Sequence, residues 1–159
     1  MKKLLLASFV ITFLAVASCL AQGGGSIKVT ANTQTGSCIF AATSVSEDIT
    51  RTVSAPNPTF GPIVLTKLID KCSVPLYKSL FTGRSVSKVV ISLFDSTNGA
   101  AGTEVLRLTL ANTIISGIND ADSAIGPAEK VSLVYQMITI FDPIDNTTAT
   151  CSPTTGLCS

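Results

Sequence analysis

The sequence predicts a mainly β protein, an antiparallel two-sheet barrel or sandwich with one short α-helix on its flank. Three segments in the second half of the chain alternate apolar and polar residues, as half-buried strands do. Turn-forming stretches separate them, and such connections join neighbouring antiparallel strands. Because only one helical pattern interrupts the series, the expected class is two packed sheets with a helix beside them. The segments are SKVVISLFD, TEVLRLTLANTIISGI and EKVSLVYQMITIFD, and the turns between them are DSTNGAAG and NDADSAIGP.

The first half of the chain predicts shorter strands around a proline-rich loop. Stretches rich in Thr, Val and Ile indicate strands at Ile27–Thr30 and Cys38–Ala42. Residues 50–62 hold three prolines and a glycine. Since proline cannot donate to a sheet ladder, we expect an exposed loop there. IVLTKLID, residues 63–70, then predicts another short strand.

The helix is predicted between residues 73 and 83. Ser73 is the expected N-cap, and Pro75 lies in the first turn, where its missing N–H is not needed. Gly83 supplies the stop. An apolar face at four-residue spacing should pack against a sheet, because so short a helix needs packing to persist. Its members are Leu76, Tyr77, Leu80 and Phe81.

The three long segments also predict which side chains share a face. Val89, Ile91 and Leu93 alternate in the first segment. In the second segment Leu106, Leu108 and Leu110 do the same, and the stretch after Asn112 is expected to bulge or bend. The third segment is predicted as a single strand whose face carries Val131, Leu133, Tyr135, Met137 and Phe141.

The N-terminus predicts a secretory signal peptide over residues 1–21. Lys2 and Lys3 precede an uncharged stretch from Leu4 to Ala17, which is shorter than the roughly 20 apolar residues of a membrane span. A Gly-rich linker (residues 22–26), a β domain (27–142) and a polar, cysteine-containing tail (143–159) outside the sheet complete the predicted organisation. No other segment predicts a membrane span, so the mature chain should be soluble.

Three processing sites compete at the end of the leader. Cleavage after Ala21 is favoured and gives a soluble periplasmic or extracellular product. Val16-Ala17-Ser18-Cys19 also fits a lipoprotein box, in which Cys19 would carry a lipid and GGGS would act as a tether. Cleavage after Ala17 would leave Cys19 as an unpaired thiol, which cysteine parity disfavours.

The remaining cysteines agree with export. Without Cys19, four are left, an even number for an oxidising compartment. Three pairings exist, of which Cys151–Cys158 is the most local, and Cys38–Cys72 would then be the second bridge. Buried free thiols are the alternative.

The composition argues against most kinds of catalytic, metal-binding and nucleic-acid-binding site. The chain contains no histidine, which excludes Ser-His-Asp and Cys-His nucleophilic sites and histidine metal ligation. Asp120 and Asp122 resemble the start of a calcium loop, but Ala124 and Ile125 stand where a ligand and a glycine are required. Without Lys2 and Lys3, nine basic residues face ten acidic ones, so nucleic acid is not an expected partner. We expect no enzyme, metal or cofactor.

LTKLIDKCSVPLYKSLFTG, residues 65–83, is followed by a strand, a Gly-rich turn, a long strand and a closing strand that begins with Glu129, Val131 and Leu133. This order of motifs is similar to that of Hcp, the haemolysin-coregulated tube protein of type VI secretion. The family pattern runs Phe-x-Lys-x-Ile-Asp, a serine–proline–leucine helix start, a glycine, and later Glu-x-Val-x-Leu. Leu65 stands here where the family has phenylalanine. The resemblance is good over residues 63–142 and loose over residues 26–62. The matching positions are Lys67, Ile69, Asp70, Ser73, Pro75, Leu76, Gly83, Glu129, Val131 and Leu133.

The resemblance implies a two-sheet barrel with a flanking helix and no catalytic centre. It also implies hexameric rings that stack into tubes, with secretion-apparatus or effector proteins as partners. Two features depart from the family: the leader and the four remaining cysteines. They leave a second hypothesis open, a monomeric secreted or envelope-attached binding module that reuses the fold. A hydrolase is the remote third.

Overall fold

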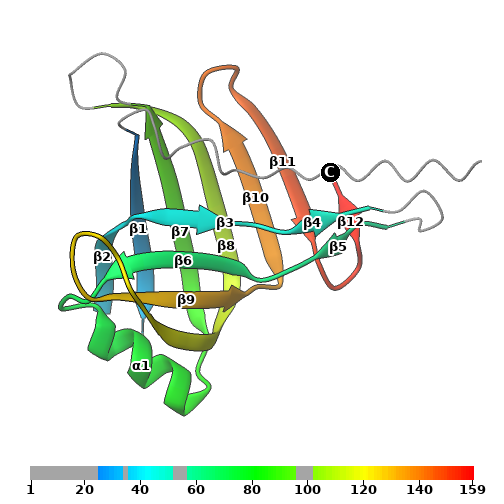
Figure 1. Ribbon diagram of the computed structural model, residues 1–159. Helices are drawn as coiled ribbons and strands as arrows, with labels where there is room; N and C mark the ends of the chain where they lie inside the picture. The colour runs from blue at the N-terminus through cyan, green and yellow to red at the C-terminus, as the bar shows by residue number, and fades with distance from the viewer. Residues whose placement is uncertain (1–24, 34–35, 52–56, 96–101) are drawn as a thin grey trace, which may run out of the picture.

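Two packed antiparallel sheets and one short helix make up most of the part of the chain that the structure describes, as the sequence predicted (Figure 1). The computed structural model describes residues 25–33, 36–51, 57–95 and 102–159. The predicted signal peptide, its cleavage sites and Cys19 lie outside these residues. Within the described residues, no helix has the length and apolarity to cross a membrane.

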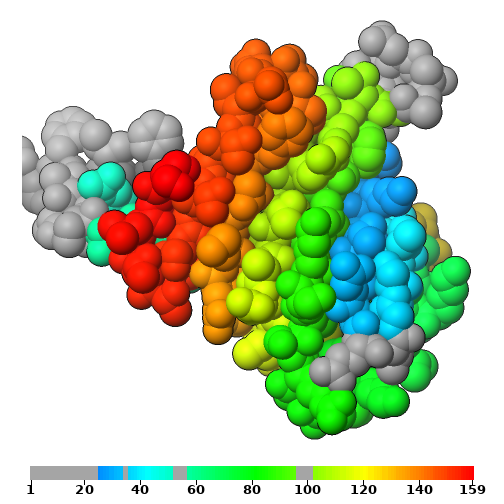
Figure 2. Space-filling view, turned by 180° about the vertical axis from the view of Figure 1, so that it is seen from behind, coloured from blue at the N-terminus to red at the C-terminus, as the bar shows by residue number. Residues whose placement is uncertain are grey.

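The larger sheet is the broad wall of the molecule. Its strands follow one another in the order β12-β11-β10-β8-β7-β1-β2. Figure 2 shows this wall from behind, with the colours running from the red C-terminal strands to the blue N-terminal ones. The strands are β1 (Ser26–Thr33), β2 (Gly36–Ala42), β7 (Val86–Asp95), β8 (Thr103–Ala121), β10 (Met137–Asp142), β11 (Thr147–Ser152) and β12 (Leu157–Cys158).

The second sheet lies across the inner face of the first (Figure 1). It consists of β3 (Ser44–Ser46), β6 (Ile63–Leu68), β9 (Ala128–Val134) and the second half of β8. β8 belongs to both sheets because it bends between them. Asn112 has a φ of 50°, and the β8–β9 register shifts between Ile115 and Gly117. The bend predicted after Asn112 is therefore confirmed.

The core lies where the two sheets face each other. The alternating faces predicted from the sequence supply it: Val89, Ile91 and Leu93 are buried, as are Leu108 and Leu110. Both sheets and the helix contribute side chains around its centre. Residues with at most 1% of their surface exposed include Val29, Ile63, Leu65, Val86, Val131 and Ile138.

The third long segment was predicted as one strand, and this is wrong. It forms two strands, β9 and β10, which pair in different sheets. The chain turns the corner at Tyr135 and Gln136, where the Gln136 N–H donates to the Ala111 carbonyl at 3.2 Å. Tyr135 stays buried, but Met137 is 45% exposed, because its face changes at the corner.

The C-terminal tail was expected outside the sheet, and this is also wrong. β11 pairs with β10, and β12 pairs with β11, so residues 147–158 form a C-terminal hairpin that extends the wall. Gly156 in its turn has a φ of 67°, and a side chain there would meet Asn57. Asn57 Nδ2 donates to the Thr155 carbonyl at 3.4 Å, which ties the hairpin to the segment before β5.

The proline-rich segment contains a short ladder that the sequence did not predict. β4 (Ile49–Thr50) pairs with β5 (Thr59–Phe60) in a separate two-stranded sheet. Its partners are Ile49 with Phe60 and Thr50 with Thr59. Both strands are two residues long, and β5 lies between Pro58 and Pro62, consistent with the limits that proline sets on a ladder.

Helix α1 spans Ser73–Thr82 and flanks the second sheet (Figure 1). Gly83 ends it in a left-handed conformation, with its N–H donating to the Leu80 carbonyl, as predicted. The predicted N-cap is wrong: Cys72 occupies that position, and Ser73 is the first helical residue. The helix packs through Leu76, whereas Phe81 is 81% exposed. Only part of the predicted apolar face therefore meets the core.

Candidate functional site

Four of the motif residues meet at one junction, in which Lys67, Ser73 and Glu129 are buried and Asp70 lies at the surface. Lys67 comes from the end of β6, Asp70 from the turn that follows, Ser73 from the start of α1, and Glu129 from β9. The β6–β9 register places Lys67 directly opposite Glu129. Cross-strand neighbours on one face of a sheet are close enough to pair, and the turn brings Ser73 over them. We call these four residues the buried polar junction.

The Lys67 ammonium is the centre of this junction. Its Nζ lies 2.9 Å from Glu129 Oε1 and 2.9 Å from Asp70 Oδ1. It also donates to Ser73 Oγ at 3.1 Å and to the Leu68 carbonyl at 2.8 Å. The Phe40 ring of β2 lies 5.2 Å away, within cation–π range. The ammonium therefore links β6, β9, β2 and the start of α1.

The Ser73 hydroxyl connects the charges to the helix. It donates to Glu129 Oε1 at 2.8 Å and accepts from the Asp70 N–H at 3.1 Å. Asp70 Oδ1 in turn accepts from the Cys72 N–H at 2.8 Å. The first turn of α1 is thereby held by side chains of the loop and of β9. This explains why Ser73 is not the N-cap: its oxygen is used by the junction.

Burial decides what the junction can do. Lys67 is 0% exposed, Glu129 1% and Ser73 5%. A serine hydroxyl beside a lysine is an arrangement that can supply a nucleophile, but here solvent does not reach it and the hydroxyl already donates to a carboxylate. The arrangement is suited to joining the helix to both sheets.

The other motif residues are distributed between the core and the surface. Leu76, Val131 and Leu133 are buried in the core, and Gly83 ends the helix. Pro75 is half-buried. The Ile69 side chain is 54% exposed. The residue contributes to the fold through its backbone, whose N–H donates to the Pro127 carbonyl at 3.1 Å.

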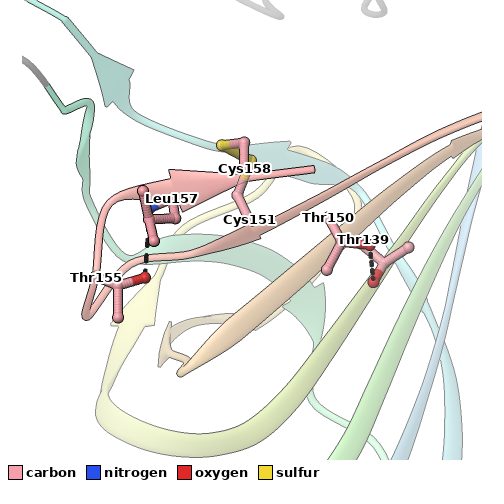
Figure 3. Close-up of a disulfide and its surroundings, with 6 residues drawn as sticks. All are labelled: Thr139, Thr150, Cys151, Thr155, Leu157 and Cys158. Carbon is pink, nitrogen blue, oxygen red and sulfur yellow. Dashed lines mark hydrogen bonds between the residues drawn. A yellow bond between two sulfur atoms is a disulfide. The ribbon is translucent and has the colours of Figure 1, made fainter.

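The cysteines occupy two separate places. Cys151 and Cys158 form a disulfide across the C-terminal hairpin, as predicted for the most local pair (Figure 3). Cys38 and Cys72 are free and buried, so the second predicted bridge is not formed in this structure. Burial, followed by the neighbouring Cys72 thiol, raises the pKa of Cys38 to about 12. Among the described residues, no cluster of three or more His, Cys, Asp or Glu could hold a metal ion.

The C-terminal disulfide is expected to stabilise the fold modestly. Replacing both Cys151 and Cys158 by serine should lower the free energy of unfolding by about 2 kcal/mol, because the bond closes a short loop in the unfolded chain. Urea denaturation followed by circular dichroism measures this. Reduction of the unsubstituted protein in which Cys38 and Cys72 are free should lower the denaturation midpoint to the same extent, and an unchanged midpoint in the double variant would contradict the expectation.

A second polar pair was missed in the sequence. Two buried oxygens have no hydrogen-bond partner among the described residues. They are Oε1 of Glu47, which lies between β3 and β4, and the hydroxyl oxygen of Tyr135. Burial raises the pKa of Glu47. Burial, and then the Glu47 charge, raise the pKa of Tyr135 to about 12. No local pattern signals these two groups, because they are far apart in the sequence.

Glu47→Gln is expected to stabilise the protein at pH 8. The raised pKa means that the folded state favours the protonated carboxyl, so ionisation of Glu47 destabilises the folded state. This destabilisation is complete above the folded pKa and disappears as the pH falls towards the pKa of Glu47 in the unfolded chain. The gain over the unsubstituted protein should therefore shrink between pH 8 and pH 4.5. Urea midpoints at several pH values give this difference.

Glu104→Gln is the matched control with the opposite sign. Hydrogen bonding from Arg107 lowers the pKa of Glu104, and Arg107 Nε donates to Glu104 Oε1 at 2.9 Å. The charged form is favoured on folding, so this variant should be less stable than the unsubstituted protein at pH 8. That loss should disappear as the pH falls through the folded pKa. Equal pH profiles for the two variants would refute both assignments.

A comparison with protein-family models decides the family. The model described as the type VI secretion system effector Hcp matches residues 24–141. The chain belongs to the Hcp family. The buried polar junction lies within the matched residues, whereas the C-terminal hairpin lies beyond them. No curated protein matches the sequence.

Solved structures of Hcp proteins share the fold. A crystal structure of an Hcp protein has a TM-score of 0.73 at 15% identity, covering 80% of this chain and 97% of the other. The secreted protein Hcp3 from Pseudomonas aeruginosa gives 0.71 at 17%, covering 80% and 97%. Hcp1 from Salmonella typhimurium gives 0.70 at 14%, covering 85% and 99%. These identities establish the Hcp fold.

Proposed function

We propose that this Hcp-family protein is an exported, non-enzymatic structural subunit that assembles into hexameric rings or tubes. The observation that carries the proposal is the family match over residues 24–141. The sheet-and-helix architecture extends over nearly the whole length of the solved Hcp chains. A type VI secretion apparatus or its effectors would be the partners.

The described surface also suits a subunit that buries area against neighbours. Several large apolar side chains are exposed, at α1 and at the turn between β8 and β9. Interfaces between subunits are enriched in such residues. The exposed residues include Val74 (75%), Phe81 (81%) and Ile125 (69%).

The predicted leader and the C-terminal disulfide favour a location outside the cytoplasm. Disulfides persist mainly in oxidising compartments, and Cys151–Cys158 is formed in the structure. These two features support the second candidate function, a monomeric secreted or envelope-attached module that uses the Hcp fold for binding. Intact-mass analysis of protein recovered from the host envelope tests export: loss of residues 1–21 is expected, and a diacylglyceryl mass on Cys19 would show lipid anchoring instead.

Assembly is tested by light scattering coupled to gel filtration, with negative-stain images of the same fractions. Rings of six subunits are expected at high protein concentration. Strictly monomeric particles over the whole concentration range would refute the ring proposal and favour the binding module. The C151S/C158S variant is the control, because the C-terminal hairpin lies outside the family match and its bond should not be needed for rings.

A further inference from the structure

Two thiols meet beside the buried polar junction. Cys38 belongs to β2, and Cys72 is the last residue before α1. Cys38 is 7% exposed and Cys72 1%. Cys72 Sγ lies 3.8 Å from the carbonyl of Ile39, the residue that follows Cys38 in β2, and the neighbouring Cys72 thiol helps to raise the pKa of Cys38. Residues 34 positions apart in the chain are thus placed beside each other.

The contact joins an exposed strand edge to the helix. β2 is the last strand of the wall and pairs with β1 on one side. Its Ile39 carbonyl accepts a hydrogen bond from the Cys72 thiol, which stands directly before α1. Unpaired edges are sites of unwanted pairing unless they are protected, and a covalent link at this point would fix the edge strand to the start of the helix.

We propose that Cys38 and Cys72 form a disulfide when the protein folds in an oxidising compartment, which locks the start of α1 to the edge strand β2. The structure contains the reduced form of this pair. Formation of this bond requires oxidising conditions but no ring assembly. A negative result for the hexamer would therefore leave this proposal unaffected, and the reverse also holds.

The oxidant is a small-molecule disulfide such as oxidised glutathione. One cysteine thiolate attacks the glutathione disulfide, forms a mixed disulfide and releases one reduced glutathione. The second cysteine thiolate then attacks the protein sulfur of the mixed disulfide and releases the other. The protein loses two electrons and two protons, and the glutathione disulfide is reduced to two thiols.

The bond should form during folding and not afterwards. Exchange requires a thiolate and access to it. In the folded chain both cysteines are buried, and the pKa of Cys38 is raised to about 12. A protein that has folded in the reduced state should therefore stay reduced when oxidised glutathione is added.

The test uses the full chain with Cys19→Ser, Cys151→Ser and Cys158→Ser, so that only Cys38 and Cys72 remain. It is unfolded with reductant and refolded either in a glutathione redox buffer or with reductant. N-ethylmaleimide is then added in denaturant, and the intact mass is measured. No labelled thiol is expected after refolding with glutathione, and two after refolding with reductant. The oxidised form should also have a Tm roughly 5–15 °C higher.

Two results would overturn the proposal. One is two labelled thiols in a chain that refolded with glutathione and has a native circular dichroism spectrum. The other is separate glutathione adducts on each cysteine. A Cys38→Ser variant is the matched control, and its Tm should not respond to glutathione. If the serine variants fail to fold, non-reducing peptide mapping of the unsubstituted protein gives the same decision: a Cys38–Cys72 peptide supports the bond, and two separately alkylated peptides exclude it.

Discussion

Lys67→Met is expected to lower the free energy of unfolding by about 3–5 kcal/mol, because it leaves a buried carboxylate without its counter-charge. Glu129 is 1% exposed, and its Oε1 is held by the Lys67 ammonium and by the Ser73 hydroxyl. Methionine fills most of the volume but supplies no donor. Urea denaturation at pH 7, followed by circular dichroism, measures the loss.

Two further variants separate the effect of charge on the free energy of unfolding from the effect of packing. Lys67→Met combined with Glu129→Leu removes both charges and should recover much of the stability, because well-packed apolar residues often replace a buried ion pair without loss. Asp70→Asn keeps the oxygen that accepts from the Cys72 N–H. Since the Asp70 side chain is 36% exposed, this variant should change stability by less than about 1 kcal/mol. A large loss in the double variant, with little loss in Lys67→Met, would contradict the argument.

The sequence could predict the parts of the fold that depend on local alternation. Val89, Ile91 and Leu93 show the period of two that only a strand with one buried face produces, and they are buried. Gly83 predicted the helix end because a left-handed residue favours glycine. The Asn112 bend was predictable for a related reason, since asparagine tolerates positive φ better than most residues.

Two features of the fold were not predicted from the sequence, each for a different reason. The third long segment keeps its alternation as far as Met137, yet it changes sheets at Tyr135, and the contact that accompanies the corner involves Ala111. The tail looks polar because half of the residues of β11 are exposed, and its place in the wall depends on pairing with β10. Ala111 is distant in sequence from the corner, whereas β10 immediately precedes β11 in the chain and the two form a hairpin.

The buried polar junction shows how the motif is related to the fold. Lys67 and Glu129 are 62 residues apart, and sequence analysis could mark both only through resemblance to the family. The structure gives the physical reason for the pattern: a lysine at the end of one strand, a glutamate opposite it, and a serine at the helix start form one network. The motif therefore specifies how α1 attaches to the sheets. It does not by itself specify a binding surface.

Ile91→Ala is expected to lower the free energy of unfolding by about 2–5 kcal/mol, because it removes three carbon atoms from the centre of the core and leaves a cavity that the sheets cannot close. Ile91 is 0% exposed and lies between Val29 of β1 and Leu108 of β8. Its central place in the wall restricts relaxation on both sides. Chemical denaturation gives the loss as a lower midpoint at unchanged slope.

Ile125→Ala is the matched control for this prediction. The substitution removes the same atoms, but Ile125 is 69% exposed in the turn between β8 and β9, so the free energy of unfolding should change by less than about 0.5 kcal/mol. The same variant also tests assembly, because a shift towards monomers without loss of stability would place Ile125 in a contact between subunits. Comparable losses at Ile91 and Ile125 would mean that the wall and the turn do not differ in packing, which would contradict the arrangement of the core described above.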